Sequence, residues 1–152
     1  MGWTYIDGAT RADVICELTR REDSHSVSAQ VIAHALRGNV LWTVCVLTAK
    51  HDSAIAGLAA GQSTRFIGCN LLARDSTGWG YKDMAEAVHP YYYTCPLSYL
   101  DMAPEASHSW RAGVRAYHAS GCRDVARQAA DAALEQERSR AVQANACQAV
   151  TA

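Results

Sequence analysis

The sequence lacks an excess of charge of either sign. It carries 14 basic and 15 acidic side chains among 152 residues, and its formal net charge is -1. Proteins that bind duplex nucleic acid usually have a clear basic excess, because neutralising phosphates supplies much of their affinity. A mimic of DNA would need a strong acidic excess instead. The composition therefore argues against a nucleic-acid partner and against a DNA mimic.

The sequence also lacks a long apolar run. The longest, residues 40–47, is far too short to span a bilayer. Residues 1–7 contain neither the basic segment nor the apolar segment of a secretory signal. We therefore expect a soluble protein inside the cell, with no membrane partner.

Paired cysteine and histidine motifs are missing as well. Six cysteines are present, but none forms a CxxC or CxxH pair, and the histidines show no HExxH spacing. No glycine-rich loop ends in the Gly-Lys-Ser/Thr that holds phosphates. The simplest interpretation makes the cysteines small buried apolar residues in a reducing compartment. We expect no metal and no cofactor.

The first half of the chain shows the patterns of one helix and three strands. Thr10 and Asp13 form a capping-box pattern at the start of a helix predicted over residues 10–21. Alternation predicts a strand over 26–36 with residues 27, 29, 31, 33 and 35 on one face. A turn over 37–39 leads to the strongest strand, 40–48, which is apolar on both faces and therefore central. A third strand is predicted over 65–74.

The second half is predominantly helical. A short helix is predicted over 96–102, and a longer one over 105–119 with Trp110, Val114 and Tyr117 on one face. The final segment, about 124–146, has high helix propensity but few large apolar residues.

These elements predict an α+β fold. We expect a mainly antiparallel sheet of three to four strands, covered by helices. The predicted organisation is one domain over residues 1–120 and a C-terminal helix over 121–152, with an end that we expect to fray. Its alanine-rich stripe is a candidate seam for a homodimer.

Between the strands and the helices lies a dense region of aromatics, prolines and glycines, residues 78–96. We refer to it as the signature region and predict that it forms a loop fixed in one shape. Its polar core is Lys82, Asp83 and Glu86. One interpretation makes Asp83 and Glu86 an acid/base pair or a metal-binding pair in a cleft roofed by tyrosines, with Lys82 shifting their pKa values. The structural interpretation, which we favour, has Asp83 cap a short helix and Glu86 complete a capping box.

The aromatic residues of the signature region are candidates for binding a partner. In an extended segment Tyr91 and Tyr93 point one way and Tyr92 the other, so at least one ring should be exposed. Cys95 has a nucleophile interpretation, but a buried structural cysteine is favoured. Arg111 and Arg115 follow helical spacing and could grip an acidic group. The predicted partner-binding residues are Trp79, Tyr81, Tyr91, Tyr92, Tyr93, Arg111 and Arg115.

The signature region resembles a family of small uncharacterised proteins carried by bacterial plasmids and phages. The resemblance rests on the Gly-Tyr-Lys-Asp-Met-x-Glu core at residues 80–86, followed by Pro90 and by Cys95-Pro96. The opening residues 1–4 and the Trp-Arg helix from Trp110 also fit, so that most of residues 1–118 is covered. His89 stands where the family pattern has glycine. The resemblance implies an accessory protein of a mobile genetic element in the cytoplasm of a bacterial host, and it implies no activity.

The sequence therefore favours a non-catalytic binding protein that modulates a host or element protein through the signature region. Two alternatives stay open. The first is a small enzyme, a hydrolase or transferase that uses Asp83 and Glu86. The second is a nucleic-acid-associated regulator, which would need a clustered basic face.

Overall fold

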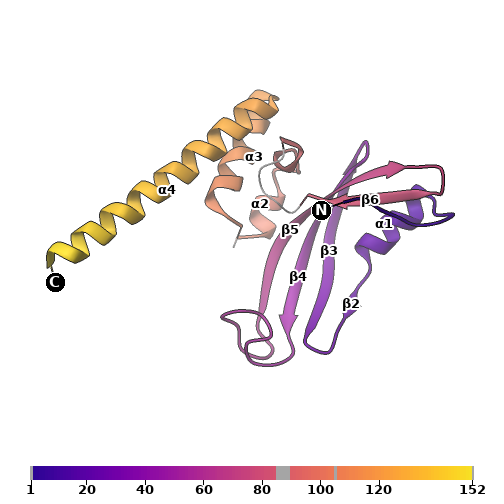
Figure 1. Ribbon diagram of the computed structural model, residues 1–152, viewed down its shortest axis with the longest axis horizontal. Coiled ribbons are helices and arrows are strands. Elements are labelled where there is room, and N and C mark those ends of the chain that lie inside the picture. Colours follow the sequence, from indigo (N-terminus) through magenta and orange to yellow (C-terminus); the bar gives the residue numbers. More distant parts are fainter. Residues whose placement is uncertain (1, 85–89, 105, 152) are drawn as a thin grey trace. The chain divides into compact units, whose positions relative to one another are not determined.

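The structure, a computed structural model, describes residues 2–84, 90–104 and 106–151 (Figure 1). The described residues form two compact units. The first, which we call the sheet unit, is drawn from Met1–Ala87 and Ser98–Ala106. The second, the helical unit, is drawn from Val88–Leu97 and Ser107–Ala152. The domain boundary expected at residue 120 stays a prediction.

The α+β class is confirmed, but the sheet has six strands rather than three or four. Its strands are antiparallel and lie in the order β1-β6-β5-β4-β3-β2. Their bounds are β1 Thr4–Tyr5, β2 Glu22–Asp23, β3 Val27–Arg37, β4 Val40–Ala49, β5 Ser63–Arg74 and β6 Trp79–Asp83. The three predicted strands are β3, β4 and β5. The two-residue strands are too short for a periodic signal, and β6 lies where we predicted a loop.

The central hairpin forms for the reasons that the sequence indicates. Gly38 has a φ of 59°, which glycine adopts readily, and it stands first in the two-residue turn between Arg37 and Val40. Strand β4 lies inside the sheet between β3 and β5. Leu41 on one of its faces and Val44 on the other are both fully buried, as expected for a strand that is apolar on both sides.

A β-bulge in β3 overturns the predicted alternation. Val31 pairs with Cys45, but Ala33 pairs with Val44, so one extra residue, Ile32, sits between two consecutive pairs. Ala33 and Ala35 therefore lie on the opposite face of the sheet from Val31. A bulge has no strong sequence signal, which is why strict alternation predicted a single face.

Helix α1, Arg11–Thr19, packs on one face of the sheet, which we call the helix face. Thr10 accepts a hydrogen bond from the backbone N–H of Asp13, and the Asp13 carboxylate accepts one from Thr10, so the predicted capping box is present. Val14 of this helix is fully buried. The Arg11 guanidinium also donates to the carbonyl of Gly38 in the β3–β4 turn, which ties the start of the helix to the sheet.

The opposite face of the sheet carries the short helix α2, Tyr99–Met102. The Arg65 guanidinium of β5 donates to the Met102 carbonyl oxygen at 3.2 Å. Tyr99, Leu100 and Ala103 are buried. This segment returns to the sheet unit after the chain has entered the helical unit.

The helical unit contains the 3-10 turn η1, Pro90–Tyr93, followed in sequence order by α3, His108–Ser120, and α4, Arg123–Thr151. Ser107 caps α3, and Gly121 ends it with a φ of 70°. Three alanines of α4, at positions 126, 130 and 133, are buried. Residues 134–148 of α4 are all exposed. The homodimer seam predicted there stays a prediction.

No helix among the described residues is long and apolar enough to cross a membrane.

Candidate functional site

The signature region is not one loop. Residues Trp79–Asp83 form strand β6 of the sheet unit, whereas Pro90–Tyr93 form η1 of the helical unit. The prediction of a single fixed loop over 78–96 is therefore wrong for its first part. The period-2 pattern of five residues, interrupted by Gly80, is too short to distinguish a strand from a loop.

The two glycines of β6 allow β1 to approach closely. A Cβ at Gly80 would lie 2.2 Å from the Thr4 carbonyl oxygen, and one at Gly78 would lie 2.3 Å from that of Ile6. Both distances are far below any real contact, so only glycine fits. Strand β1 pairs with β6 through Thr4 opposite Tyr81 and Tyr5 opposite Gly80. The start of the chain and the first part of the signature region thus form one structural element.

Strand β6 presents alternate residues to the two faces of the sheet. Trp79 and Tyr81 point to the helix face, and Gly80 and Lys82 to the other, because successive strand residues alternate. Lys82 and Asp83 therefore project to opposite faces. This arrangement does not bring together the Lys82–Asp83 pair that the catalytic interpretation requires.

The capping interpretation of Asp83 stays a prediction. Asp83 is the last residue of β6 and pairs with Asn70, and residues 85–89, which a helix capped by Asp83 would include, lie outside the described part of the chain. Glu86, the second member of both interpretations, lies outside the described residues.

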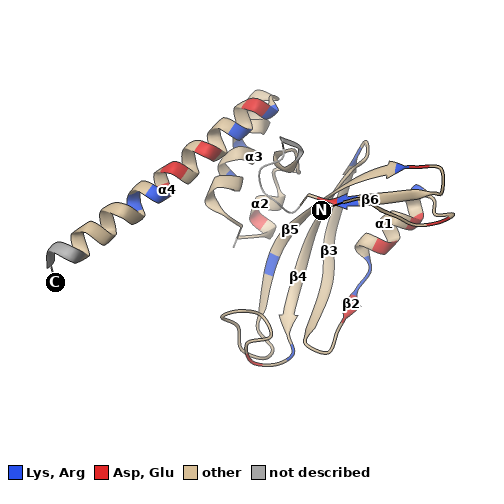
Figure 2. Cartoon of the chain, viewed as in Figure 1, with Lys and Arg blue, Asp and Glu red and all other residues tan. Residues whose placement is uncertain are grey.

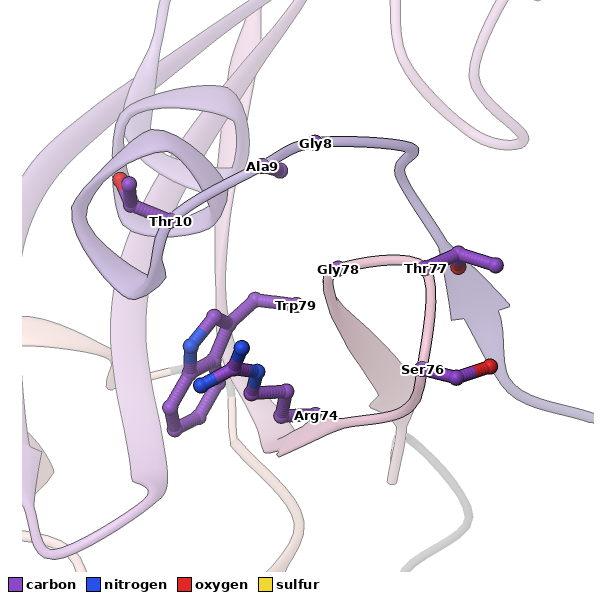
Figure 3. A pocket seen from close by; sticks show the side chains of 8 residues that line it. All are labelled: Gly8, Ala9, Thr10, Arg74, Ser76, Thr77, Gly78 and Trp79. Carbon is purple, nitrogen blue, oxygen red and sulfur yellow. The ribbon is translucent and has the colours of Figure 1, made fainter.

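Trp79 lines a cavity of about 300 Å³ beside the start of α1. Its walls are the loop Gly8–Thr10 and the β5–β6 turn, and Arg74 lies directly across from Trp79 in the sheet (Figure 3). The polar side chains around this cavity form hydrogen bonds with residues close to them in sequence. Thr77 donates to Asp75, whose carboxyl pKa lies below its ordinary value mainly because of that bond, and the Thr10 hydroxyl accepts from Asp13. We interpret this cavity as a gap left by a turn and a cap.

Tyr81 lines a second cavity of about 290 Å³ on the helix face, which we call the helix-face cavity. Its other walls come from α1, β2, β3, β4 and β5, and the lining residues include Leu18, Val31, Cys45, Leu47 and Phe66. Burial, the main cause, raises the pKa of the Cys45 thiol above its ordinary value. That thiol is therefore neutral near pH 7 and contributes an apolar wall.

An exposed aromatic pair lies on the opposite face at the edge of the sheet. Trp3 and Tyr5 stack with their ring centroids 5.8 Å apart and their planes 19° from parallel. The pair is 39% and 36% exposed, respectively. Tyr5 lies opposite Gly80, where the absence of a side chain leaves room for its ring. Sequence reasoning missed this pair, although two aromatics two positions apart at the start of the chain are a signal that could have identified it.

The second part of the signature region is largely packed inside the helical unit. Tyr93 is 2% exposed, and burial is the main reason why the pKa of its hydroxyl is raised. A Cβ at Gly113 of α3 would lie 2.4 Å from the Tyr93 ring, so that ring fills the space above a glycine. Tyr93 is therefore a core residue in this structure rather than an exposed contact.

Tyr92 is half-buried beside Trp110. The two rings meet edge-on with centroids 5.5 Å apart, and the Trp110 indole N–H donates to the Tyr92 carbonyl oxygen at 3.0 Å. Arg111 is half-buried and Arg115 is exposed on α3. The side chain of Tyr91 lies outside the described part of the structure. The role of these residues in binding a partner stays a prediction.

The cysteines divide into two groups. Cys45, Cys69 and Cys95 are buried as expected, but Cys16, Cys122 and Cys147 are exposed. Burial raises the pKa of the Cys69 thiol to about 12, which makes it a poor nucleophile. Cys95 is fully buried, and its carbonyl oxygen lies 2.7 Å from Nε2 of His118. This burial supports the structural interpretation of Cys95.

Charged residues of both signs are mixed along the described chain (Figure 2). Helix α4 carries four arginines and four acidic residues, and Arg127 lies one turn before Asp131. No group of three or more His, Cys, Asp or Glu side chains within the described ranges could hold a metal ion.

A scan against protein-family models found no match, and neither did searches of curated proteins and of solved structures.

Proposed function

We propose that this protein is a non-catalytic accessory binding protein of a mobile genetic element, and that it modulates a host or element protein. The proposed contact surface is the aromatic edge, defined as Trp3, Tyr5 and Lys82. The observation that carries the proposal is the stacked, solvent-exposed pair of Tyr5, in the edge strand β1, and Trp3, which directly precedes that strand.

Large exposed aromatics favour a protein partner. Tryptophan and tyrosine are enriched at protein interfaces because they bury a large area with few rotatable bonds. Trp3 and Tyr5 are already stacked on each other, so little side-chain freedom remains to be lost on binding. Lys82 projects to the same face of β6 as Gly80. It adds a positive charge that suits an acidic group of the partner.

The strand pairing supports the same surface. The resemblance to plasmid and phage proteins rests in part on residues 1–4 and on residues 80–86, and β1 pairs with β6 at Thr4–Tyr81 and Tyr5–Gly80. Two separated parts of that pattern therefore meet at one edge of the sheet. A shared contact surface accounts for both.

The test is quantitative capture of a partner by the folded full-length protein from the native host, followed by measurement of binding to the identified protein. Trp3→Ala and Tyr5→Ala should each weaken binding by roughly 10-fold to 100-fold, the range expected for aromatic anchors. The control is Val142→Ala, because Val142 is an exposed large apolar residue of α4, at 68%. It should leave binding unchanged.

Two results would distinguish binding through the aromatic edge from binding through the helical unit. If Tyr92→Ala or Arg115→Ala abolishes binding while Trp3→Ala has no effect, the contact surface is wrong and the original prediction of Tyr92 and Arg115 gains support. If no variant changes capture, the aromatic edge is not the contact. Circular dichroism of each variant must show an unchanged fold for either conclusion.

A further inference from the structure

The helix-face cavity lies apart from the aromatic edge, because its residues point to the other face of the sheet. Cys45 pairs with Val31 on one side and Phe66 on the other, so the three side chains share one face. The bulge after Val31 ends this arrangement, since Ala33 and Ala35 turn to the opposite face. The cavity is therefore built by the sheet and covered in part by the end of α1.

The size of the cavity limits what it can hold. Its volume of about 290 Å³ is near the lower end of the range for small-molecule sites, which is ~300–1,000 Å³. A cavity of ~150 Å³ accommodates benzene. The helix-face cavity therefore suits one bicyclic ring, or one ring with a short chain.

The wall of the cavity is apolar and partly open to solvent. Phe66 faces it and is nevertheless 43% exposed, although large aromatics are usually more fully covered. Leu18 of α1 and Tyr81 of β6 complete the apolar part of the lining. An apolar ring would gain free energy by covering Phe66 and losing its own contact with water.

The rim of the cavity carries a net negative charge. The Arg20 guanidinium lies 3.1 Å from the Glu17 carboxylate and 3.2 Å from that of Glu22. All three residues line the cavity, and Arg20 supplies the only cationic side chain among its lining residues. Two carboxylates and one guanidinium leave a formal charge of -1. A monocation would neutralise this rim, and an anion would be repelled by it.

We propose that the helix-face cavity binds a small monocationic amine with an apolar ring. The ring lies against Leu18 and Phe66. The ammonium group lies at the rim beside the second carboxylate oxygens of Glu17 and Glu22, because Oε1 of each already contacts the Arg20 guanidinium. The aromatic rings of Phe66 and Tyr81 add a favourable interaction with the cation. This ligand is separate from the protein partner proposed above, so either proposal can fail alone.

The test compares three probes of similar shape and different charge. Tryptamine is a cation, tryptophol is neutral and indole-3-propionate is an anion. Binding to the full-length protein is followed by NMR titration at low salt. Tryptamine should bind roughly tenfold more tightly than tryptophol, and indole-3-propionate should bind most weakly, because one net charge at short range contributes about 1 to 2 kcal/mol at a solvent-exposed rim. The shifted resonances should include Phe66 and Val31.

Changing the rim charge should reverse this order. The double variant Glu17→Gln with Glu22→Gln leaves Arg20 alone, so the formal charge of the rim changes from -1 to +1. The variant should prefer indole-3-propionate over tryptamine. Both glutamate side chains are well exposed, at 40% and 63%, so the fold should tolerate the change. The matched control, Glu135→Gln with Glu137→Gln on α4, should keep the original order.

Filling the cavity should weaken the binding of all three probes. Ala29 lines the cavity beside Leu47, and Ala29→Leu places a larger side chain there. Equal binding of the three probes, binding of none at millimolar concentration, or an unchanged order in the double glutamate variant would each overturn the proposal. If Ala29→Leu fails to fold, the order of probe binding in the double glutamate variant still tests the proposal.

Discussion

The sheet unit and the helical unit bury their apolar residues in different ways. In the sheet unit, large side chains such as Leu41 and Trp42 are covered on both faces of a central strand. In the helical unit, the buried part of α4 consists of alanines, and the large buried residues are aromatics such as Trp110 and Tyr93. The sheet unit leaves a cavity beside α1, whereas in the helical unit the Tyr93 ring packs directly over Gly113.

This difference explains where the signature residues lie. Trp79 and Tyr81 come from strand β6 and project to the helix face, where each is half-buried and lines a cavity. Tyr93 and Cys95 come from a segment that serves as core for the helices, and both are buried. The aromatic residues of the signature region therefore have two different environments, half-buried positions beside cavities in the sheet unit and the core of the helical unit.

The largest expected effect is that of Trp110→Ala in the helical unit. The change removes a ring that is 3% exposed and the hydrogen bond to the Tyr92 carbonyl oxygen. We expect a loss of about 3–5 kcal/mol in the free energy of unfolding of that unit. Hydrogen exchange followed by mass spectrometry should show lost protection in α3 and the first half of α4, while β4 keeps its protection.

The control for this prediction is Leu41→Ala, which should deprotect the sheet unit instead. An equal loss of protection in β4 and α3 for Trp110→Ala would show that the two units unfold together rather than independently.

An intermediate effect is expected for Gly113→Ala. Helix propensity alone predicts that alanine stabilises a helix by about 1 kcal/mol relative to glycine. The new Cβ would lie 2.4 Å from the Tyr93 ring and 3.2 Å from the Ala126 carbonyl oxygen, and the Tyr93 ring is itself buried. We expect a net destabilisation of about 1–3 kcal/mol in urea denaturation.

The exposed position Ala119 on the same helix provides the comparison. Ala119→Gly should cost about 0.5–1 kcal/mol through propensity alone. Stabilisation by Gly113→Ala would mean that the aromatic packing of the helical unit is looser than described here.

The smallest effect is expected at the capping box of the sheet unit. Thr10→Ala removes the hydroxyl that accepts from the Asp13 N–H and should cost about 1 kcal/mol in thermal or urea denaturation near pH 7. Thr10→Ser keeps the hydroxyl and should be close to neutral. A cost for serine equal to that for alanine would indicate that the methyl group, not the cap, matters.

The same box predicts a dependence on pH. The Thr10 backbone N–H, followed by its hydroxyl, holds the pKa of the Asp13 carboxyl below its ordinary value of 3.8. A lowered folded-state pKa means that the carboxylate stabilises the fold above pH 3.8 and loses this effect as the pH falls through the folded-state value. Asp13→Asn should therefore differ from the natural protein at pH 7 and converge with it in strong acid, as measured by denaturation at both pH values.

Local patterns predicted the parts of the fold that depend on neighbours in sequence. The capping box at Thr10 and the turn at Gly38 are such features, since their partners lie within a few residues. The strand β4 was also predictable, because a run apolar on both faces is typical of a central strand. The bulge at Ile32 was not, because it depends on how β3 pairs with β4.

The candidate sites were predicted only in part. Trp79 and Tyr81 were identified from aromatic density. That Trp79 lies beside the start of α1 and Tyr81 beside its end follows only from strand β6 and its register in the sheet. Trp3 and Tyr5 were missed because they lie about 75 residues from Gly80, and only the pairing of β1 with β6 brings them together. The rim of Glu17, Arg20 and Glu22 was likewise invisible, because each residue is an ordinary charged residue in sequence.

By itself the sequence determined the α+β class, the central hairpin and the long final helix, because periodicity, caps and turns act over a few residues. Only the tertiary structure decided that the signature region divides between two units, that glycine is required at positions 78 and 80, and that the helix-face cavity exists. These features form where segments far apart in sequence pack against each other. The free energy of that packing depends on tertiary contacts, which local sequence patterns do not predict.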